Sequence, residues 1–299
     1  MRLYLAVITL FLSGFSLKAQ QSPAAPKTSS LLWEISGNGM QTPSYLFGTM
    51  HILCARDAGL SDSLNHAIDK SSRVFFEIDM DNMGEMMGIF KYIRMKDETR
   101  LKDLMTEEEY KRVKDYFAAN RSILPLSMME RFKPYFIAAM LSESKMPCET
   151  KNGMEEVIMK AVKKQKKEIS GLETIEFQAS IFDSIPYSQQ ARELLQAIDS
   201  SGKEDTVTAK MLEVYRSQDL DAIEKLTKME EGGLGSYMEL FLYGRNKKWI
   251  PEMEKAMKNG TILFAVGAAH LPGYEGVINL LRKAGYTLRP MRHSVAQTL

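Results

Sequence analysis

The chain has 299 residues, of which 44% are hydrophobic and 26% are charged, an ordinary composition for a globular protein with one large or two small domains. Its 39 Lys and Arg residues nearly balance its 38 Asp and Glu residues. This balance excludes the strong basic field that would hold nucleic acid or a membrane surface, so we expect no nucleic-acid partner.

An apolar run near the N-terminus predicts a secretory signal peptide. A single Arg2 precedes the apolar residues 3–15, and the small residue Ala19 follows at the expected cleavage point. This order is typical of signal peptides, and the run is too short to span a membrane comfortably. We therefore expect a signal peptide over 1–19, export to the periplasm or the extracellular space, and no transmembrane span in the mature chain.

The rest of the chain divides into a linker and one domain over 31–299. Residues 20–30 are rich in Pro, Ser and Ala and lack periodicity, which is typical of a linker. Residues 31–37 and 44–52 predict two strands around a turn rich in Gly, Asn and Pro. Residues 74–80 predict a third strand, whose nearly continuous apolar character is typical of a strand covered on both faces.

A long helical middle separates these strands from a second group near the C-terminus. Helical patterns dominate residues 83–165 and 188–258, with a predicted strand between them at 167–174. Residues 261–268 and 286–291 predict two further strands on either side of a helix. This order predicts a single α/β domain with a mixed central sheet drawn from both termini and a long helical middle.

Two Gly-x-x-His motifs stand at opposite ends of the domain. They are the pairs Gly48/His51 and Gly267/His270, and each lies at the carboxyl end of a predicted strand. A glycine lets the backbone turn tightly and lets a ligand approach, while a histidine at the end of a rigid strand suits a metal ligand or a general base. Because sites in open α/β sheets form beyond the carboxyl ends of strands, we expect the two motifs to meet. The alternative is that each imidazole only hydrogen-bonds to neighbouring backbone.

The cysteines and the other two histidines carry weaker signals. An even count of cysteines in an oxidising compartment suggests a disulfide between Cys54 and Cys148. Two unpaired buried thiols are one alternative, and a metal-binding pair of His51 and Cys54 is another, although such a pair lacks the further ligands of a zinc site. His66 and His293 have no partner pattern and are predicted to lie on the surface.

Glu77 interrupts an otherwise apolar predicted strand. A carboxylate at such a position is costly unless it is paired, protonated or bound to a metal. Asp79 lies two residues further on and is expected on the same face, so the strand offers two carboxylates on one side. The alternative is that both face solvent on an edge strand.

The motifs together resemble one known family. The segments FGTMH, FFEIDM, GLETIEFQ, GRNKKW and FAVGAAHLPGYEGVINLLRKAGYTLRPM are similar to the TraB/GumN (TIKI-like) superfamily, and the resemblance covers residues 31–291. It implies a metal-dependent hydrolase centre, with protease activity in some members. The centre would be built on the two Gly-x-x-His motifs and on the strand glutamate, Glu77.

The resemblance also implies roles at the centre. His51, Glu77 and His270 would hold a divalent ion, with Mn, Co and Zn as candidates, and a water would complete the site. The ion would lower the pKa of that water and polarise a carbonyl. If Glu77 is a ligand, Glu173 would act as the base; otherwise Glu77 itself could be the base.

Further residues are assigned by the same resemblance. Arg245 would hold a substrate carboxylate or stabilise a developing oxyanion, unless it is a surface arginine in an ordinary salt bridge. Asn246, Gly48 and Gly267 are expected to line the substrate site. Glu155 stands where many relatives would carry Asp, and it is expected only to support the site from behind.

The leading functional hypothesis is therefore an exported metal-dependent hydrolase, with peptidase as its specific form, acting on a peptide or another small substrate. The first alternative is a non-catalytic binding protein of the cell envelope that sequesters a peptide or small ligand. A third reading is haem or iron handling with the two histidines as axial ligands, for which the sequence has no attachment motif.

Overall fold

The computed structural model describes the domain with short gaps. The described residues are 29–120, 124–144, 146, 148–200, 206–229 and 237–294. The predicted signal peptide lies outside them, as does the predicted linker up to residue 28. Ser30, the last residue of that linker, already belongs to the fold, because its hydroxyl donates to the Met291 carbonyl at 2.6 Å.

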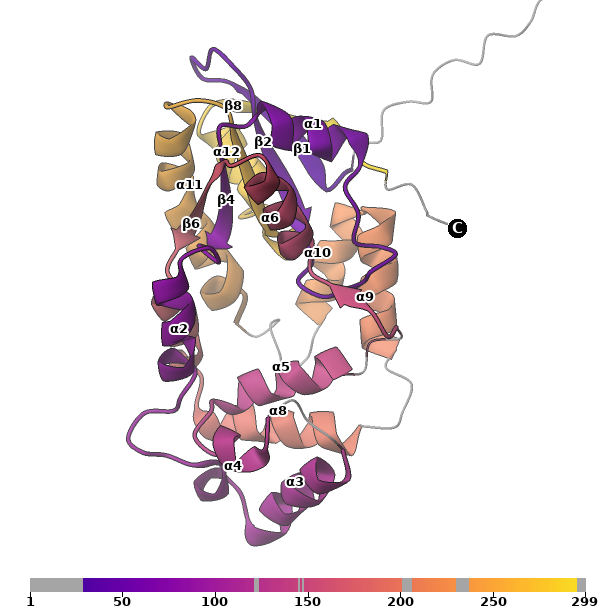
Figure 1. The fold of residues 1–299 in the computed structure, drawn as a ribbon, viewed down its shortest axis with the longest axis vertical. Coiled ribbons are helices and arrows are strands. Elements are labelled where there is room, and N and C mark those ends of the chain that lie inside the picture. Colours follow the sequence, from indigo (N-terminus) through magenta and orange to yellow (C-terminus); the bar gives the residue numbers. More distant parts are fainter. Residues whose placement is uncertain are drawn as a thin grey trace, which may run out of the picture.

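A six-stranded mixed sheet forms the centre of the upper half of the molecule (Figure 1). Its strands are β1 (Leu32–Gly37), β2 (Ser44–Thr49), β4 (Arg73–Ile78), β6 (Glu168–Glu173), β7 (Ile262–Gly267) and β8 (Tyr286–Met291). They lie in the order β6-β4-β7-β2-β1-β8; β6, β4, β7 and β2 are parallel, and β1 is antiparallel to both neighbours. Strands from both ends of the chain are neighbours, which confirms the predicted α/β domain with its mixed sheet.

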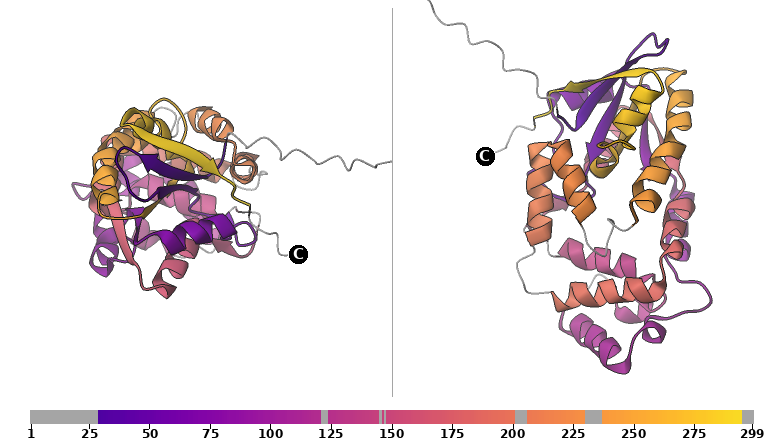
Figure 2. Two further views of the ribbon diagram at one scale, coloured as in Figure 1. Left: turned by 90° about the horizontal axis from the view of Figure 1, so that it is seen from above. Right: turned by 180° about the vertical axis from the view of Figure 1, so that it is seen from behind.

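Helices cover both faces of the sheet because its inner strands are apolar on both sides. β2 is buried along its whole length, and β7 is buried everywhere except at Gly267, as expected for parallel strands between two helical layers. One face carries α1 (Asp62–Lys70) and α6 (Met154–Lys164), and the other carries α11 (Gly244–Met257) and α12 (Val277–Lys283) (Figures 1 and 2). Phe47, Phe264 and Trp249 are among the largest buried side chains of this core.

A helical lobe with its own core lies below the sheet (Figure 1). It contains α3 (Glu107–Ala119), α4 (Leu126–Met129), α5 (Pro134–Ser144) and α8 (Tyr187–Asp199). Ile137 and Leu194 are fully buried in it. α3 begins with a capping box, in which Thr106 and Glu109 each accept from the other's backbone N–H, and α5 begins at Pro134, where a missing N–H costs nothing.

Further helical elements lie beside the sheet, within the lobe or between the two. They are α2 (Met83–Tyr92), η1 (Leu101–Leu104), α7 (Ile175–Ile181), η2 (Phe182–Ser184), α9 (Thr206–Ser217), α10 (Leu220–Met229), the π-helical turn η4 (Glu239–Tyr243) and η5 (Ala268–His270). η4 runs directly into α11. Within the described residues, no helix is both long and apolar enough to cross a membrane.

A disulfide lies beside the pairing of two short strands. Cys54 and Cys148 are bonded, with their Cα atoms 5.7 Å apart, next to the pairing of β3 (Leu53–Cys54) with β5 (Lys151–Asn152). This agrees with the disulfide suggested by the sequence and removes Cys54 as a thiolate metal ligand. The bond fixes the segment after His51 against the segment that leads into α6.

The two histidines predicted to lie on the surface behave differently from each other. His66 is exposed, as predicted. His293 is only 8% exposed, with Nδ1 2.8 Å from the hydroxyl of Ser61 and its ring against Phe47, so the prediction for it was wrong. Burial lowers the pKa of His293 to about 4. The ring partners Ser61 and Phe47 are more than 200 positions away in the chain, so no local pattern revealed them.

Candidate functional site

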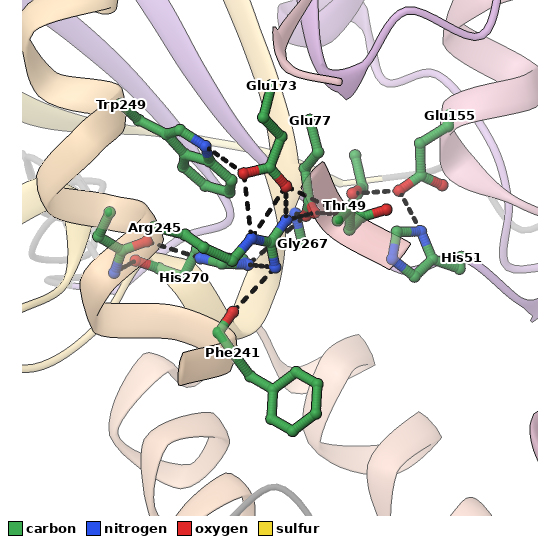
Figure 3. Close-up of polar contacts among 12 residues, drawn as sticks. Thr49, His51, Glu77, Glu155, Glu173, Phe241, Arg245, Trp249, Gly267 and His270 are labelled. Carbon is green, nitrogen blue, oxygen red and sulfur yellow. Dashed lines mark hydrogen bonds and ion pairs between the residues drawn. The ribbon is translucent and has the colours of Figure 1, made fainter. Parts of the chain in front are cut away.

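The carboxyl ends of β2, β4, β6 and β7 meet at the edge of the sheet that faces the helical lobe. A cleft of about 460 Å³ lies there, a volume in the range of small-molecule sites. Its polar lining includes Thr49, His51, Glu77, Arg245 and His270 (Figure 3). Gln178, Tyr215 and Thr227 also line it. The two Gly-x-x-His motifs thus share one cleft, because β2 and β7 are parallel neighbours with Thr49 opposite Gly267.

His51 is the most exposed of these groups, and a contact with Glu155 fixes the orientation of its ring. Its Nδ1 lies 2.7 Å from Oε1 of Glu155, and its side chain is 68% exposed. The Thr49 hydroxyl donates to the same carboxylate oxygen at 2.5 Å. The hydrogen bond to Glu155 raises the pKa of His51 to about 9. Burial favours protonated Glu155, but the bond and charge of His51 together with the bond from Thr49 lower the pKa of Glu155. Because Nδ1 is engaged, Nε2 is the ring nitrogen that can meet a ligand.

His270 is buried and is held in one tautomer. Its Nδ1 lies 2.6 Å from Oδ1 of Asn246, and an amide oxygen can only accept, so Nδ1 carries the proton and Nε2 carries the lone pair. Nε2 lies 3.2 Å from Nη1 of Arg245 and 3.7 Å from Oε1 of Glu77. The ring also packs against Trp249, with centroids 4.4 Å apart. Burial lowers the pKa of His270 to about 3, so it is a neutral imidazole.

Glu77 is buried on an inner strand and is fully hydrogen-bonded. Its Oε1 accepts from the Gly267 N–H at 2.8 Å, and its Oε2 accepts from Gln178 at 3.0 Å and from Arg245. Burial alone would raise the pKa of Glu77, but the Arg245 guanidinium and the Gly267 N–H hold it below its ordinary value. The edge-strand alternative is therefore wrong for Glu77. Asp79 lies beyond the end of β4, where it accepts from the Asp81 N–H instead of joining the site.

Arg245 occupies the middle of this cluster (Figure 3). Nε and Nη2 donate to Glu173, Nη2 also donates to Glu77, and Nη1 donates to the Phe241 carbonyl and lies against His270. All five N–H groups of the guanidinium therefore have acceptors within the protein. Arg245 is only 6% exposed, so it is not a surface arginine. A substrate carboxylate could bind Arg245 only if one of these hydrogen bonds were broken.

Glu173 lies behind Arg245 and is not among the residues that line the cleft. It accepts from Arg245, from Gln178 at 3.2 Å and from Trp249 Nε1 at 3.1 Å. Burial raises the pKa of Glu173, although its donors favour the carboxylate. This position suits a counter-ion of Arg245 better than the base expected from the sequence.

The expected substrate contacts of Gly48 and Asn246 do not match their burial. Asn246 is fully buried and binds His270 and the Glu275 carbonyl. A side chain on Gly48 would meet the Cα of Ala268 at 3.1 Å, so this glycine permits close packing of the two motifs. Gly267 does line the cleft, and its N–H binds Glu77.

Sequence reasoning missed several members of the site. Gln178 bridges Glu77 and Glu173, and it stands in the segment GLETIEFQ, which was available as a signal. Thr49 lies inside the first motif and binds Glu155. The Phe241 carbonyl could not have been found, because a backbone acceptor leaves no trace in sequence.

The donor types suit a divalent ion, but their arrangement does not. Two imidazoles anchored through Nδ1 and a carboxylate are typical metal ligands with their supporting partners. However, among the described residues no group of three or more His, Cys, Asp or Glu side chains converges closely enough to hold an ion. Arg245 donates to Glu77 and lies against Nε2 of His270, so a cation already takes these positions. In this conformation the residues do not fit a metal ion.

Comparison with known proteins matches this chain to one family and to several curated proteins. The TraB/PrgY/gumN family matches residues 31–290. Similar curated proteins include Metalloprotease TIKI1 of Danio rerio, 22% identical over 86% of this chain and 62% of the relative, and Metalloprotease TIKI1 of Homo sapiens, 22% identical over 90% and 63%. A further one is the Metalloprotease TIKI homolog of Amphimedon queenslandica, 24% identical over 90% and 62%. The chain spans about three fifths of the length of these relatives, and no solved structure matches it significantly.

Proposed function

Because this chain belongs to the TraB/PrgY/gumN family, we propose that it is a hydrolase of the peptidase type, whose reaction centre carries His51, Glu77 and His270. The observation that carries the proposal is the shared orientation of the two imidazoles. Each is anchored through Nδ1, by Glu155 or by Asn246, so that Nε2 is in each case the nitrogen left for a ligand, although Arg245 Nη1 already lies 3.2 Å from that of His270. Similarity to proteins named metalloproteases supports the reaction class.

Hydrolysis of an amide requires water to add to the carbonyl carbon and the C–N bond to break, with a proton delivered to the leaving nitrogen. His51 is the exposed group of the cluster, so its Nε2 is the atom that would move this proton. Glu155 and Thr49 hold the ring in place during the transfer. Glu77 and neutral His270 form the buried floor, where Arg245 fixes their orientation.

A divalent ion, with Mn, Co or Zn as candidates, would polarise the carbonyl and lower the pKa of the attacking water. The name metalloprotease of the relatives suggests such an ion. In the present arrangement, however, Arg245 competes for the same lone pairs of Glu77 and His270. Under this proposal, the ion can bind only after Arg245 has moved away from Glu77 and His270.

Export belongs to the same proposal. Residues 1–19 have the features of a secretory signal peptide. The disulfide between Cys54 and Cys148 supports a periplasmic or extracellular location, because such bonds persist in oxidising compartments.

The second candidate is a non-catalytic binding protein that sequesters a peptide or small ligand. The saturation of Arg245 favours it, because a floor whose donors and acceptors already satisfy one another is a rigid base for binding. Such a protein would keep its function without Glu77 as a carboxylate.

Incubation of the secreted protein with a mixed-sequence peptide library tests the two candidates. We expect new peptide termini by mass spectrometry in the presence of Mn²⁺, Co²⁺ or Zn²⁺ and a large loss with EDTA. Glu77→Gln and His51→Gln should each abolish cleavage. Glu156→Gln and His66→Gln, which change exposed residues of the same types, should leave it unchanged. Absence of new termini under every condition would overturn the hydrolase proposal in favour of the binding protein.

A further inference from the structure

The polar floor of the cleft is bordered by aromatic side chains that its chemistry does not require. Tyr135 and Phe136 of α5, Phe182 of η2 and Phe241 of η4 all line the cleft, and we call these four residues the aromatic wall. Their rings form one cluster: Phe182 lies 4.7 Å from Tyr135, 4.8 Å from Phe136 and 5.2 Å from Phe241 between ring centroids. Such mutual contacts hold the rings as a preformed surface.

The aromatic wall is physically joined to the reaction centre. The carbonyl of Phe241 accepts from Nη1 of Arg245 at 2.8 Å, while its ring points away from the polar cluster (Figure 3) and packs against Tyr135 and Phe182. A group that rests on the wall is therefore held next to the residues that would act on a carbonyl. The wall and the floor form two sides of one site.

A second apolar surface completes the cleft. Met211 and Val214 of α9 and Ile223 and Leu226 of α10 also line it, and Met211 is 38% exposed. These side chains add aliphatic area without any charge. The flanks of the cleft are therefore mainly apolar, with Tyr215 and Thr227 as uncharged polar members, and its charged groups lie along the sheet edge.

The charges in the cleft define what it would reject. Of the described residues that line it, only Glu77, Arg245 and the two histidines can carry a charge, and Glu77 and Arg245 are already paired with each other. A charged substrate side chain against the aromatic wall would lose its water and find no counter-ion. A large apolar side chain would instead be removed from water at no such cost.

We infer that the aromatic wall is the specificity site for a peptide substrate, and that it accepts a large apolar side chain such as Phe, Tyr, Leu or Met next to the bond that is cleaved. This inference rests on the proposed hydrolase function for the identity of the reaction. The recognition itself rests only on the cleft lining, so binding and cleavage can be measured separately.

Ala139 offers a mild way to test the site. It lies on α5, lines the cleft and is exposed, so Ala139→Glu and Ala139→Lys add a charge at the aromatic wall without removing a packed side chain. Ala118 is an exposed alanine of α3 that does not line the cleft. Ala118→Glu is therefore a control matched in residue type, exposure and helical setting.

The first readout is the pattern of cleavage sites in a mixed-sequence peptide library. We expect the parent to cut next to Phe, Tyr, Leu or Met. Ala139→Glu should lower kcat/KM for such peptides at least about tenfold and favour Lys or Arg at that position, with the opposite preference in Ala139→Lys. Ala118→Glu should match the parent. Cleavage without residue preference, or an unchanged pattern in both Ala139 variants, would overturn the inference while the hydrolase function stands.

The second readout is binding, which separates the two proposals. Amidated peptides that differ only in one central Phe or Asp are titrated into the parent and into Glu77→Gln. Preference for the Phe peptide by about tenfold or more, without cleavage by the parent, would support the aromatic wall and overturn the hydrolase. Equal binding of both peptides, or no binding of either, would overturn the specificity site.

Discussion

At the scale of single residues, Arg245 determines how the cleft floor holds together. It is the shared partner of Glu77 and Glu173, two carboxylates with side chains no more than 8% exposed. Removal of one partner from a buried ion pair leaves an uncompensated charge, which costs far more than the pair contributes. The same guanidinium lies against the lone pair of His270. Arg245 therefore stabilises the site and at the same time keeps an ion from binding to that nitrogen.

Arg245→Met should therefore have two coupled effects. Without divalent ions, we expect the free energy of unfolding to fall by about 3 kcal/mol, because Glu77 and Glu173 lose their counter-charge. Added Mn²⁺ should stabilise the variant more than the parent and bind it more tightly, because the lone pairs of Glu77 and His270 are released. Urea denaturation with and without Mn²⁺, together with calorimetric titration, measures both effects.

Arg289→Met is the matched control for this experiment. Arg289 is an exposed arginine paired with Glu34 at 2.9 Å, and loss of a surface ion pair costs about 1 kcal/mol or less. This account of the cluster would be contradicted if the Arg245 variant were no less stable than the Arg289 variant. It would also be contradicted if Mn²⁺ did not change the stability of the Arg245 variant.

At the scale of elements, the strands and helices that follow from local sequence patterns were the part of the fold that could be predicted. The strands that became β2, β4 and β7 could be predicted because inner strands are nearly continuous apolar runs bounded by turns. Their register brings the two Gly-x-x-His motifs together, which could be anticipated from strands ending at a shared edge. The last helix begins at Val277, within the region expected for it.

The parts of the site that could not be predicted depend on partners far away in the chain. Arg245 pairs with Glu77 across 168 positions, so its burial follows from tertiary packing and not from the sequence around it. The aromatic wall gathers side chains from α5, η2 and η4, and each looks like ordinary core in its own segment. Periodicity indicates that a residue is buried, but it does not say against what.

The disulfide acts on elements that position the site. It joins residues separated by 94 positions, a loop for which chain entropy predicts a stabilisation of about 4.7 kcal/mol. Reduction should therefore lower the free energy of unfolding by roughly that amount, as measured by urea denaturation with and without dithiothreitol. The double variant Cys54→Ser/Cys148→Ser should equal the reduced parent and be insensitive to the reductant. Equal midpoints for the oxidised and reduced parent would contradict the prediction.

At the scale of the whole molecule, buried histidines give stability a pH dependence. Burial lowers the pKa of His270 to about 3 and that of His293 to about 4, whereas both take up a proton near pH 6.5 in the unfolded chain. Below pH 6.5 the unfolded chain therefore binds protons that the folded protein refuses, and stability falls as the pH falls. His51 has the opposite sign: its pKa is raised to about 9, so its contribution is complete below pH 6.5 and is lost as the pH rises through 9.

His293→Gln should flatten the acid side of this profile. Between pH 7 and pH 5 the parent should lose about 2 kcal/mol through His293 alone, and the variant should be spared that loss while Gln replaces the hydrogen bond to Ser61. Urea denaturation at the two pH values measures the difference. His66→Gln, a change at an exposed histidine, should keep the slope of the parent, and an equal slope in the His293 variant would refute the assignment.

The pairing of the first and last strands has a consequence for how the chain could be rearranged. Leu32 of β1 lies opposite Met291 of β8, so a short peptide could join the two ends of the domain. New ends opened at the turn around Asn259 and Gly260, before β7, would give a circular permutant that begins with β7 and His270 and continues through β8 into β1 and His51. Both histidines would then be encoded in one short stretch, and the elements from α1 to α11 would follow it. Connectivity is thus separable from the architecture of the cleft, which depends on which strands are neighbours and not on their order in the gene.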